Sequence, residues 1–120
     1  MLNIQADLRA KLAEAFEPDV TVSVNVPETR PNKLITVRRG GGAWLNRLQD
    51  QAGVNIYCWA KTEADAQQLA DDVAHFMQNL TFAQGYELVE MEGMYSDSDL
   101  ESKSPRWFIS YTITTHEVKN

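Results

Sequence analysis

The chain has 120 residues, of which 43% are hydrophobic, so it is long enough for one domain and too short for two ordinary ones. Its net charge of −6 argues against an isolated high-affinity nucleic-acid binder, because such affinity comes largely from Lys and Arg that neutralise phosphates. One cysteine excludes an internal disulfide framework. Without a run of roughly 20 apolar residues or a recognisable signal peptide, we expect a protein made in the cytoplasm with no membrane partner.

The N-terminal part predicts a helix followed by a strand. Apolar residues spaced by four favour an amphipathic helix over residues 2–17: Ile4, Leu8, Leu12 and Phe16. Pro18 ends this helix. Strict alternation of valine with small polar residues then predicts a strand over Val20–Val26, with its valines facing the core.

A loop between Pro27 and Pro31 leads into a second strand over Leu34–Arg39. We expect the glycines of residues 40–42 to stop that strand and to form a flexible turn. The pattern from Ala43 to Gln51 is ambiguous between a helical turn and a distorted hairpin arm, so it receives no assignment.

The second half predicts one more helix among three strands. Val54–Ala60 alternates as a strand with both faces partly covered, and Thr62 with Asp65 marks the start of the next helix. The apolar positions of that helix recur at steps of three and four: Ala66, Leu69, Val73, Met77 and Leu80. Two further strands are predicted over Tyr86–Tyr95, with a possible bulge at Gly93, and over Arg106–Thr115.

This order of elements predicts an α+β fold, with a mixed or antiparallel sheet of about five strands and two helices packed on one face. We expect one domain over residues 1–120, in which the helix over 2–17 precedes a sheet and second helix over 20–116.

Residues that could carry chemistry are sparse, so we expect no enzyme, no catalytic residue, no cofactor and no metal site. His75 and His116 lie outside any Cys/His ligand spacing, and Cys58 alternates with apolar residues, as a buried thiol does. Asp71 and Asp72 are adjacent on a helix and do not face each other as an acid and base would. The glycines of residues 40–42 lack the Lys and Ser/Thr of a phosphate-binding loop.

Charge is distributed unevenly along the chain. Five basic residues and no acid lie between positions 30 and 47: Arg30, Lys33, Arg38, Arg39 and Arg47. Six acids and no base lie between positions 87 and 101: Glu87, Glu90, Glu92, Asp97, Asp99 and Glu101. One interpretation is two solvated loops of opposite sign. The other is a head-to-tail contact between identical subunits, with complementary charge fixing its register and Trp44 as an anchor.

Five segments, in this order, carry a resemblance to a known family: Val26–Pro31, Val37–Gly41, Ala52–Ala60, Ala64–Val73 and Asp97–Trp107. Their succession resembles the tail terminator proteins of long-tailed bacteriophages over nearly the whole chain after the first helix. The resemblance implies a small α+β structural protein of the virion that forms a homo-oligomeric ring, expected to be a hexamer. That ring would cap the head-proximal end of the tail tube, end its polymerisation and join the tail to the head-completion proteins.

The resemblance and the charge pattern together predict an interface, between subunits or with the tail tube protein. Its candidate residues are Arg38, Arg39, Trp44, Arg47, Asp97, Asp99 and Glu101. DNA is expected to pass through the ring without specific binding, past acids that line the channel.

Two other functions remain open. A head-to-tail joining or tail completion protein of the phage neck would share the small fold and the ring. A protein of another class, a small nucleic-acid-binding module, would use the basic strand end and Trp44 to hold a single strand by charge and stacking.

Overall fold

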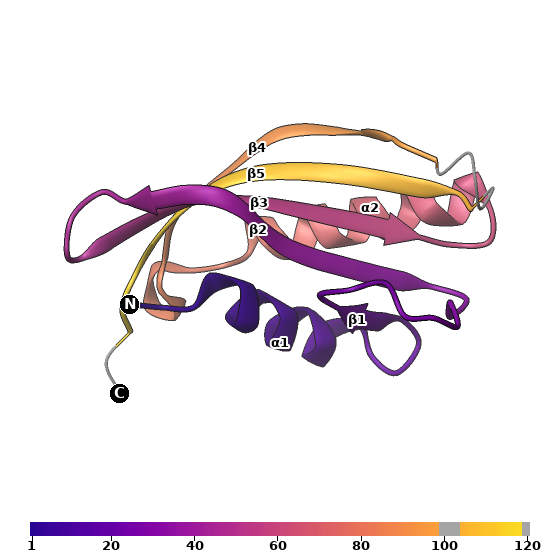
Figure 1. The fold of residues 1–120 in the computed structure, drawn as a ribbon, viewed down its shortest axis with the longest axis horizontal. Helices are drawn as coiled ribbons and strands as arrows, with labels where there is room; N and C mark the ends of the chain where they lie inside the picture. The colour runs from indigo at the N-terminus through magenta and orange to yellow at the C-terminus, as the bar shows by residue number, and fades with distance from the viewer. Residues whose placement is uncertain (99–103, 119–120) are drawn as a thin grey trace.

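A five-stranded mixed sheet carries both helices on one of its faces (Figure 1). The computed structural model describes residues 1–98 and 104–118. In chain order the elements are α1 (Ile4–Phe16), β1 (Thr21–Ser23), β2 (Leu34–Trp44), β3 (Gln49–Trp59), α2 (Glu63–Gln78), the 3-10 turn η1 (Phe82–Gln84), β4 (Tyr86–Ser96) and β5 (Arg106–His116). The strands lie in the order β1-β2-β3-β5-β4, with β1 parallel to β2 and all other pairs antiparallel. The predicted α+β class is confirmed.

The core lies between the helices and the inward face of the sheet. Alternate residues of β3 pair with apolar residues of β5, as Ile56 does with Ile109. The helices cover them with fully buried side chains that recur at helical spacing: Leu8 and Leu12 from α1, and Val73 and Met77 from α2. Each such aliphatic side chain stabilises the fold by about 1.5–3 kcal/mol relative to an exposed position. The apolar periods of the sequence therefore do predict the core.

Helix α2 begins where the sequence predicts. The Thr62 hydroxyl accepts a hydrogen bond from the backbone N–H of Asp65 at 3.1 Å, which satisfies one of the free donors of the first turn. The exposed carboxylates of Asp71 and Asp72 and the ring of His75 lie on its solvent side, as expected.

The predicted strand over Val20–Val26 is shorter than expected, since only Thr21–Ser23 pairs with β2. The Ser23 hydroxyl donates to the carbonyl of Asn25 at 2.6 Å and accepts from its N–H at 3.2 Å. This local turn competes with the sheet ladder and ends the strand. Val22 is buried as predicted, whereas Val26 is exposed.

The prediction that the glycines of residues 40–42 stop the second strand is wrong. Strand β2 continues through them to Trp44, where Gly41 pairs with Gly53 and Gly42 with Ala52, after a register shift that follows Arg39. Gly42 has a φ of +99°, a conformation that glycine adopts without strain. The glycines therefore form an irregularity within a long hairpin, and β3 starts at Gln49. The bulge predicted at Gly93 of β4 is confirmed.

The second face of the sheet carries no helix. Its central rows are small and polar, as in the row formed by Asn55 of β3 and Ser110 of β5. At the end near Trp59, this face instead carries aromatic side chains, with the rings of Tyr57 and Phe108 4.8 Å apart. The fold thus presents three surfaces outside the core: this helix-free face, the two sheet edges and the end of the β2–β3 hairpin.

Candidate functional site

The end of the β2–β3 hairpin is an ordered apolar projection at one extremity of the molecule (Figure 1). Trp44 is 60% exposed and Leu48 is 65% exposed, with Leu45 beside them. Hydrogen bonds within the turn hold it, among them those from the N–H of Leu45 to the carbonyl of Gln49 at 2.9 Å and from the N–H of Leu48 to Asn46 Oδ1 at 2.8 Å. The loop therefore presents its large side chains to solvent in a fixed arrangement, and we name Trp44, Leu45 and Leu48 the hairpin tip.

A groove of about 460 Å³ lies beside the hairpin tip, between the 46–49 turn and the residues around η1. Phe82 is 66% exposed on its rim and stacks on the ring of His116, with centroids 4.4 Å apart. The carboxylate of Glu87 lies 3.3 Å from His116 Nδ1 and accepts a hydrogen bond from Gln49 Nε2 at 2.6 Å. The groove continues the apolar surface of the tip toward η1. The hydrogen bond between Gln49 and Glu87 attaches the tip turn to β4.

Arg39, a predicted interface residue, is used inside the subunit. Its guanidinium forms a bidentate ion pair with Asp50, with N–O distances of 2.5 and 2.8 Å, and this hydrogen bonding raises the pKa of Arg39. The Asp50 side chain is only 1% exposed, whereas the guanidinium side chain keeps 29% of its surface in contact with solvent. The pair joins the two arms of the hairpin and is a structural element of the subunit.

Arg38 and Arg47 remain available on the surface. Arg38 lies on β2 and is exposed on the helix-free face, since its partner Asn55 lies on that face, and Arg47 lies in the tip turn. Within residues 1–98 and 104–118, neither side chain forms an ion pair.

Of the predicted acidic interface residues, the structure describes only Asp97. Its carboxylate lies 3.0 Å from a guanidinium nitrogen of Arg106, and its carbonyl accepts from Arg106 Nε at 2.6 Å. Asp99 and Glu101 lie outside the described residues. Asp97 and the hairpin tip are at opposite ends of β3, about 33 Å apart along an extended strand of this length. Asp97 is therefore too far from the hairpin tip to contact it within one subunit.

At the Trp59 end of the helix-free face, arginine guanidinium groups stack on aromatic rings. The sequence did not predict these contacts. The guanidinium carbon of Arg30 lies 4.4 Å from the Trp59 ring centroid, and that of Arg106 lies 4.8 Å from the same ring and 4.7 Å from Tyr57. Trp59 is consequently only 4% exposed. These stacks fix the loop before β2 and the start of β5 onto the sheet.

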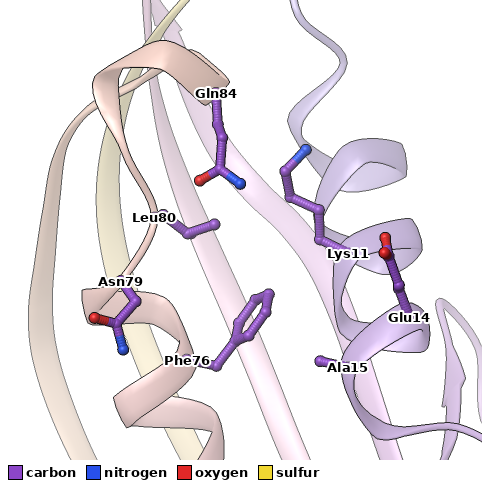
Figure 2. A pocket seen from close by; sticks show the side chains of 7 residues that line it. All are labelled: Lys11, Glu14, Ala15, Phe76, Asn79, Leu80 and Gln84. Carbon is purple, nitrogen blue, oxygen red and sulfur yellow. The ribbon is translucent and has the colours of Figure 1, made fainter.

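The groove between α1 and α2 offers no convergent chemistry (Figure 2). It measures about 370 Å³, and the Phe76 ring lies between the helices, facing the side of α1 that carries Ala15. Lys11 and Glu14 both come from α1, and the Lys11 amine already pairs with Asp7 at 2.9 Å. The groove is a seam between two packed helices.

The residues considered for chemistry in the sequence lie in ordinary structural positions. Cys58 is fully buried as predicted, and burial raises the pKa of its thiol. Within the described part of the chain, no three His, Cys, Asp or Glu side chains lie close enough to hold a metal ion. In that same part, no helix is long and apolar enough to cross a membrane.

Two structurally important side chains were missed in the sequence. Asp50 was left in the unassigned segment, although counting back by twos from Val54 through Ala52 places it on the inward face of the strand. Glu63 opens α2 and accepts from Trp107 Nε1 at 2.9 Å, and its hydrogen bonds to Ser96, Trp107 and Ser98 lower its pKa. The sequence carries no local signal for the hydrogen bond between Trp107 and Glu63, because it joins residues 44 positions apart.

Comparison with known proteins does not place the chain in a family. No protein-family model matches it, and no curated protein matches it.

Proposed function

We propose that this chain is a structural virion protein, without catalytic activity, that forms a homo-oligomeric ring on the end of a phage tail tube. The ring ends tube polymerisation and joins the tail to the head-completion proteins. The observation that carries this proposal is the hairpin tip, an ordered apolar projection that finds no cover within the described part of its own subunit. The resemblance of the sequence to tail terminators supports the same conclusion.

The shape of the subunit suits a cap. Aromatic and aliphatic side chains on a fixed projection are typical anchors at protein interfaces, and Trp is among the residues enriched there. We assign the hairpin tip to the contact with the tail tube protein, with Arg47 at its border. A ring that binds the last tube layer through these tips, and presents different surfaces on its other side, leaves no site for the next tube subunit.

The remaining surfaces then face other partners. The side of the ring away from the tube meets the head-completion or connector protein. DNA passes through the central channel without specific binding, in keeping with the net charge of −6.

Tube polymerisation in the presence of the purified chain tests this proposal. The wild-type protein is expected to hold tubes at a defined length, and the double variant Trp44→Ser, Leu48→Ser is expected to allow overlong tubes. The physical reason is that both side chains contribute apolar contact area only at the tip and are more than half exposed in the free subunit. Electron micrographs give the length distribution.

Val26→Ser is the matched control, because it removes an exposed apolar side chain from the loop before β2, at the end of the sheet away from the tip. Tubes of wild-type length with the tip variant would contradict the assignment of the tip. If tubes have the same length distribution with and without the wild-type protein, the capping function itself is contradicted.

A head-to-tail joining or tail completion protein of the neck is the second candidate, and the same surfaces would serve it. It would bind the completed neck and leave tube length unchanged. The nucleic-acid-binding module is less well supported, because Arg39 of the basic strand end is paired with Asp50 inside the subunit and the net charge of the chain is −6. Oligonucleotide affinity at moderate salt separates that candidate from the ring protein.

A further inference from the structure

The two edges of the sheet carry opposite charge. At one edge, β1 covers only Leu34–Thr36 of β2, so the rest of β2 has no neighbouring strand on that side. At the other edge, β4 runs for 11 residues without an outer neighbour. The exposed charged side chain on the free part of β2 is Arg38, whereas β4 exposes Glu90 and Glu92.

These charges lie at the same height on the sheet. Arg38 pairs with Asn55, Asn55 with Ser110, and Ser110 with Gly93, which directly follows Glu92. Glu90 belongs to the adjacent row of the same helix-free face, through its partner Thr112. The register of the sheet therefore places Arg38 at one edge at the same level along the strands as Glu90 and Glu92 at the other edge.

The two edges cannot neutralise each other within one subunit. Three strand spacings separate β2 from β4, a distance of about 14 Å, which is beyond the reach of an arginine side chain to a glutamate. Across residues 1–98 and 104–118, Arg38, Glu90 and Glu92 take part in no ion pair. A second copy placed beside the first would bring the positive edge of one against the negative edge of the other.

A contact at these edges would be made by side chains, because backbone groups on the free part of β2 already have partners. The N–H of Arg39 donates to Gln5 Oε1 of α1 at 2.8 Å, and the carbonyl of Gly41 accepts from Arg39 Nε at 3.0 Å. Strand β4 is irregular at two places, near Tyr86 and near Gly93. Edges blocked by side chains and bulges do not extend a sheet from one chain into the next.

We infer that neighbouring copies of this chain meet edge to edge, with Arg38 of one copy facing Glu90 and Glu92 of the next. This inference rests on the proposed ring and names its subunit contact. It replaces Arg39 and Asp97, which are paired inside the subunit, as the charges that join the copies. Because the two edges differ, the contact is heterologous and closes into a ring when the rotation between copies permits.

Charge exchange tests the contact on the purified full chain, with self-association measured by sedimentation and native mass at low and high salt. Arg38→Glu alone, and the pair Glu90→Arg with Glu92→Arg, are each expected to weaken association by roughly ten- to a hundredfold, because like charges then face each other. The triple variant restores opposite charges and is expected to associate within a few-fold of wild type. Wild-type association itself weakens as salt screens the contact.

Two exposed residues outside the sheet provide matched controls. Lys61→Glu in the turn before α2 and Asp71→Arg on α2 make the same changes in charge away from Arg38, Glu90 and Glu92, and are expected to leave association unchanged. Circular dichroism and thermal unfolding establish that every variant is folded.

The outcomes separate this contact from the proposed function. If Arg38→Glu associates like wild type, or if the triple variant is no better than its parents, the contact is overturned while capping stands. A wild-type chain that stays monomeric up to its solubility limit overturns the contact as well. The tube-length measurement decides the capping function independently, because it detects the cap on the tube and not the free ring.

Discussion

Arg38 and Arg39 are adjacent residues with opposite roles. Because side chains alternate along a strand, Arg38 projects from the helix-free face, while Arg39 turns to the other face and binds Asp50. A buried carboxylate is tolerated only while a cation and hydrogen bonds compensate it. The local sequence Arg38-Arg39 reads as one basic patch, but only its first member is available to a partner.

Removing the guanidinium of Arg39 is expected to cost more stability than removing its partner. Arg39→Met leaves the carboxylate of Asp50 buried and unpaired, for which we expect a loss of about 3–5 kcal/mol. Asp50→Asn is expected to cost less, because the arginine side chain is 29% exposed and its charge can be hydrated. Arg38→Met, the control, is expected to change stability by no more than about 0.5 kcal/mol. Urea unfolding gives all three values, and equal losses for Arg38→Met and Arg39→Met would contradict the assignment.

The β2–β3 hairpin is the element on which the proposed function depends. Its length follows from glycines that allow an irregularity inside the strand pair, so that the tip extends to one end of the molecule (Figure 1). A Cβ atom at Gly42 would lie 2.1 Å from the carbonyl oxygen of Gln51, and its φ of +99° is also unfavourable for other residues. A Cβ at Gly41 would meet nothing within 4 Å.

Substitution of these two glycines is therefore expected to give different results. Gly42→Ala should destabilise the chain by about 1–3 kcal/mol from backbone strain alone, and more where the hairpin must move to relieve the clash. Gly41→Ala should be neutral or stabilising by up to about 1 kcal/mol, because alanine restricts the unfolded chain. Thermal unfolding of both variants checks the difference. Similar stability for the two would mean that the hairpin does not need a glycine at position 42.

The sequence predicted the parts of these elements that follow a regular period. The alternation of Val54, Ile56 and Cys58 and the helical spacing of Leu69, Val73 and Met77 both report burial directly, and both were correct. The hairpin arm over residues 43–51 was only one of two interpretations, because three glycines usually end a strand and because a charged residue stands at the inward position 50. Its ion pair with Arg39 is a tertiary contact, and no periodicity encodes it.

For the candidate interface, the sequence indicates which residues are charged, but not which of them pair with each other. It correctly marked Trp44 and Arg47 as surface residues, since both are exposed at the hairpin turn. It could not show that Asp97 is held by Arg106, or that Glu92 lies level with Arg38 three strand spacings away, because those relations depend on sheet order and register. Strand order is set by contacts between residues far apart in the chain.

At the scale of the whole molecule, the subunit has distinct surfaces for distinct partners. The hairpin tip is apolar and lies at one extremity, while the two sheet edges differ in charge and face opposite directions. Lateral contacts through the edges and an axial contact through the tip would use separate residues. A ring built in this way can form and cap a tube without either contact blocking the other.

The position of the protein on a tail tube tests the central claim most directly. Electron micrographs of tubes incubated with gold-labelled wild-type chain show where it binds and whether it forms a ring. We predict a ring of label at one end of each tube, the head-proximal end. Label along the length of the tube, at both ends or nowhere would contradict the proposed function.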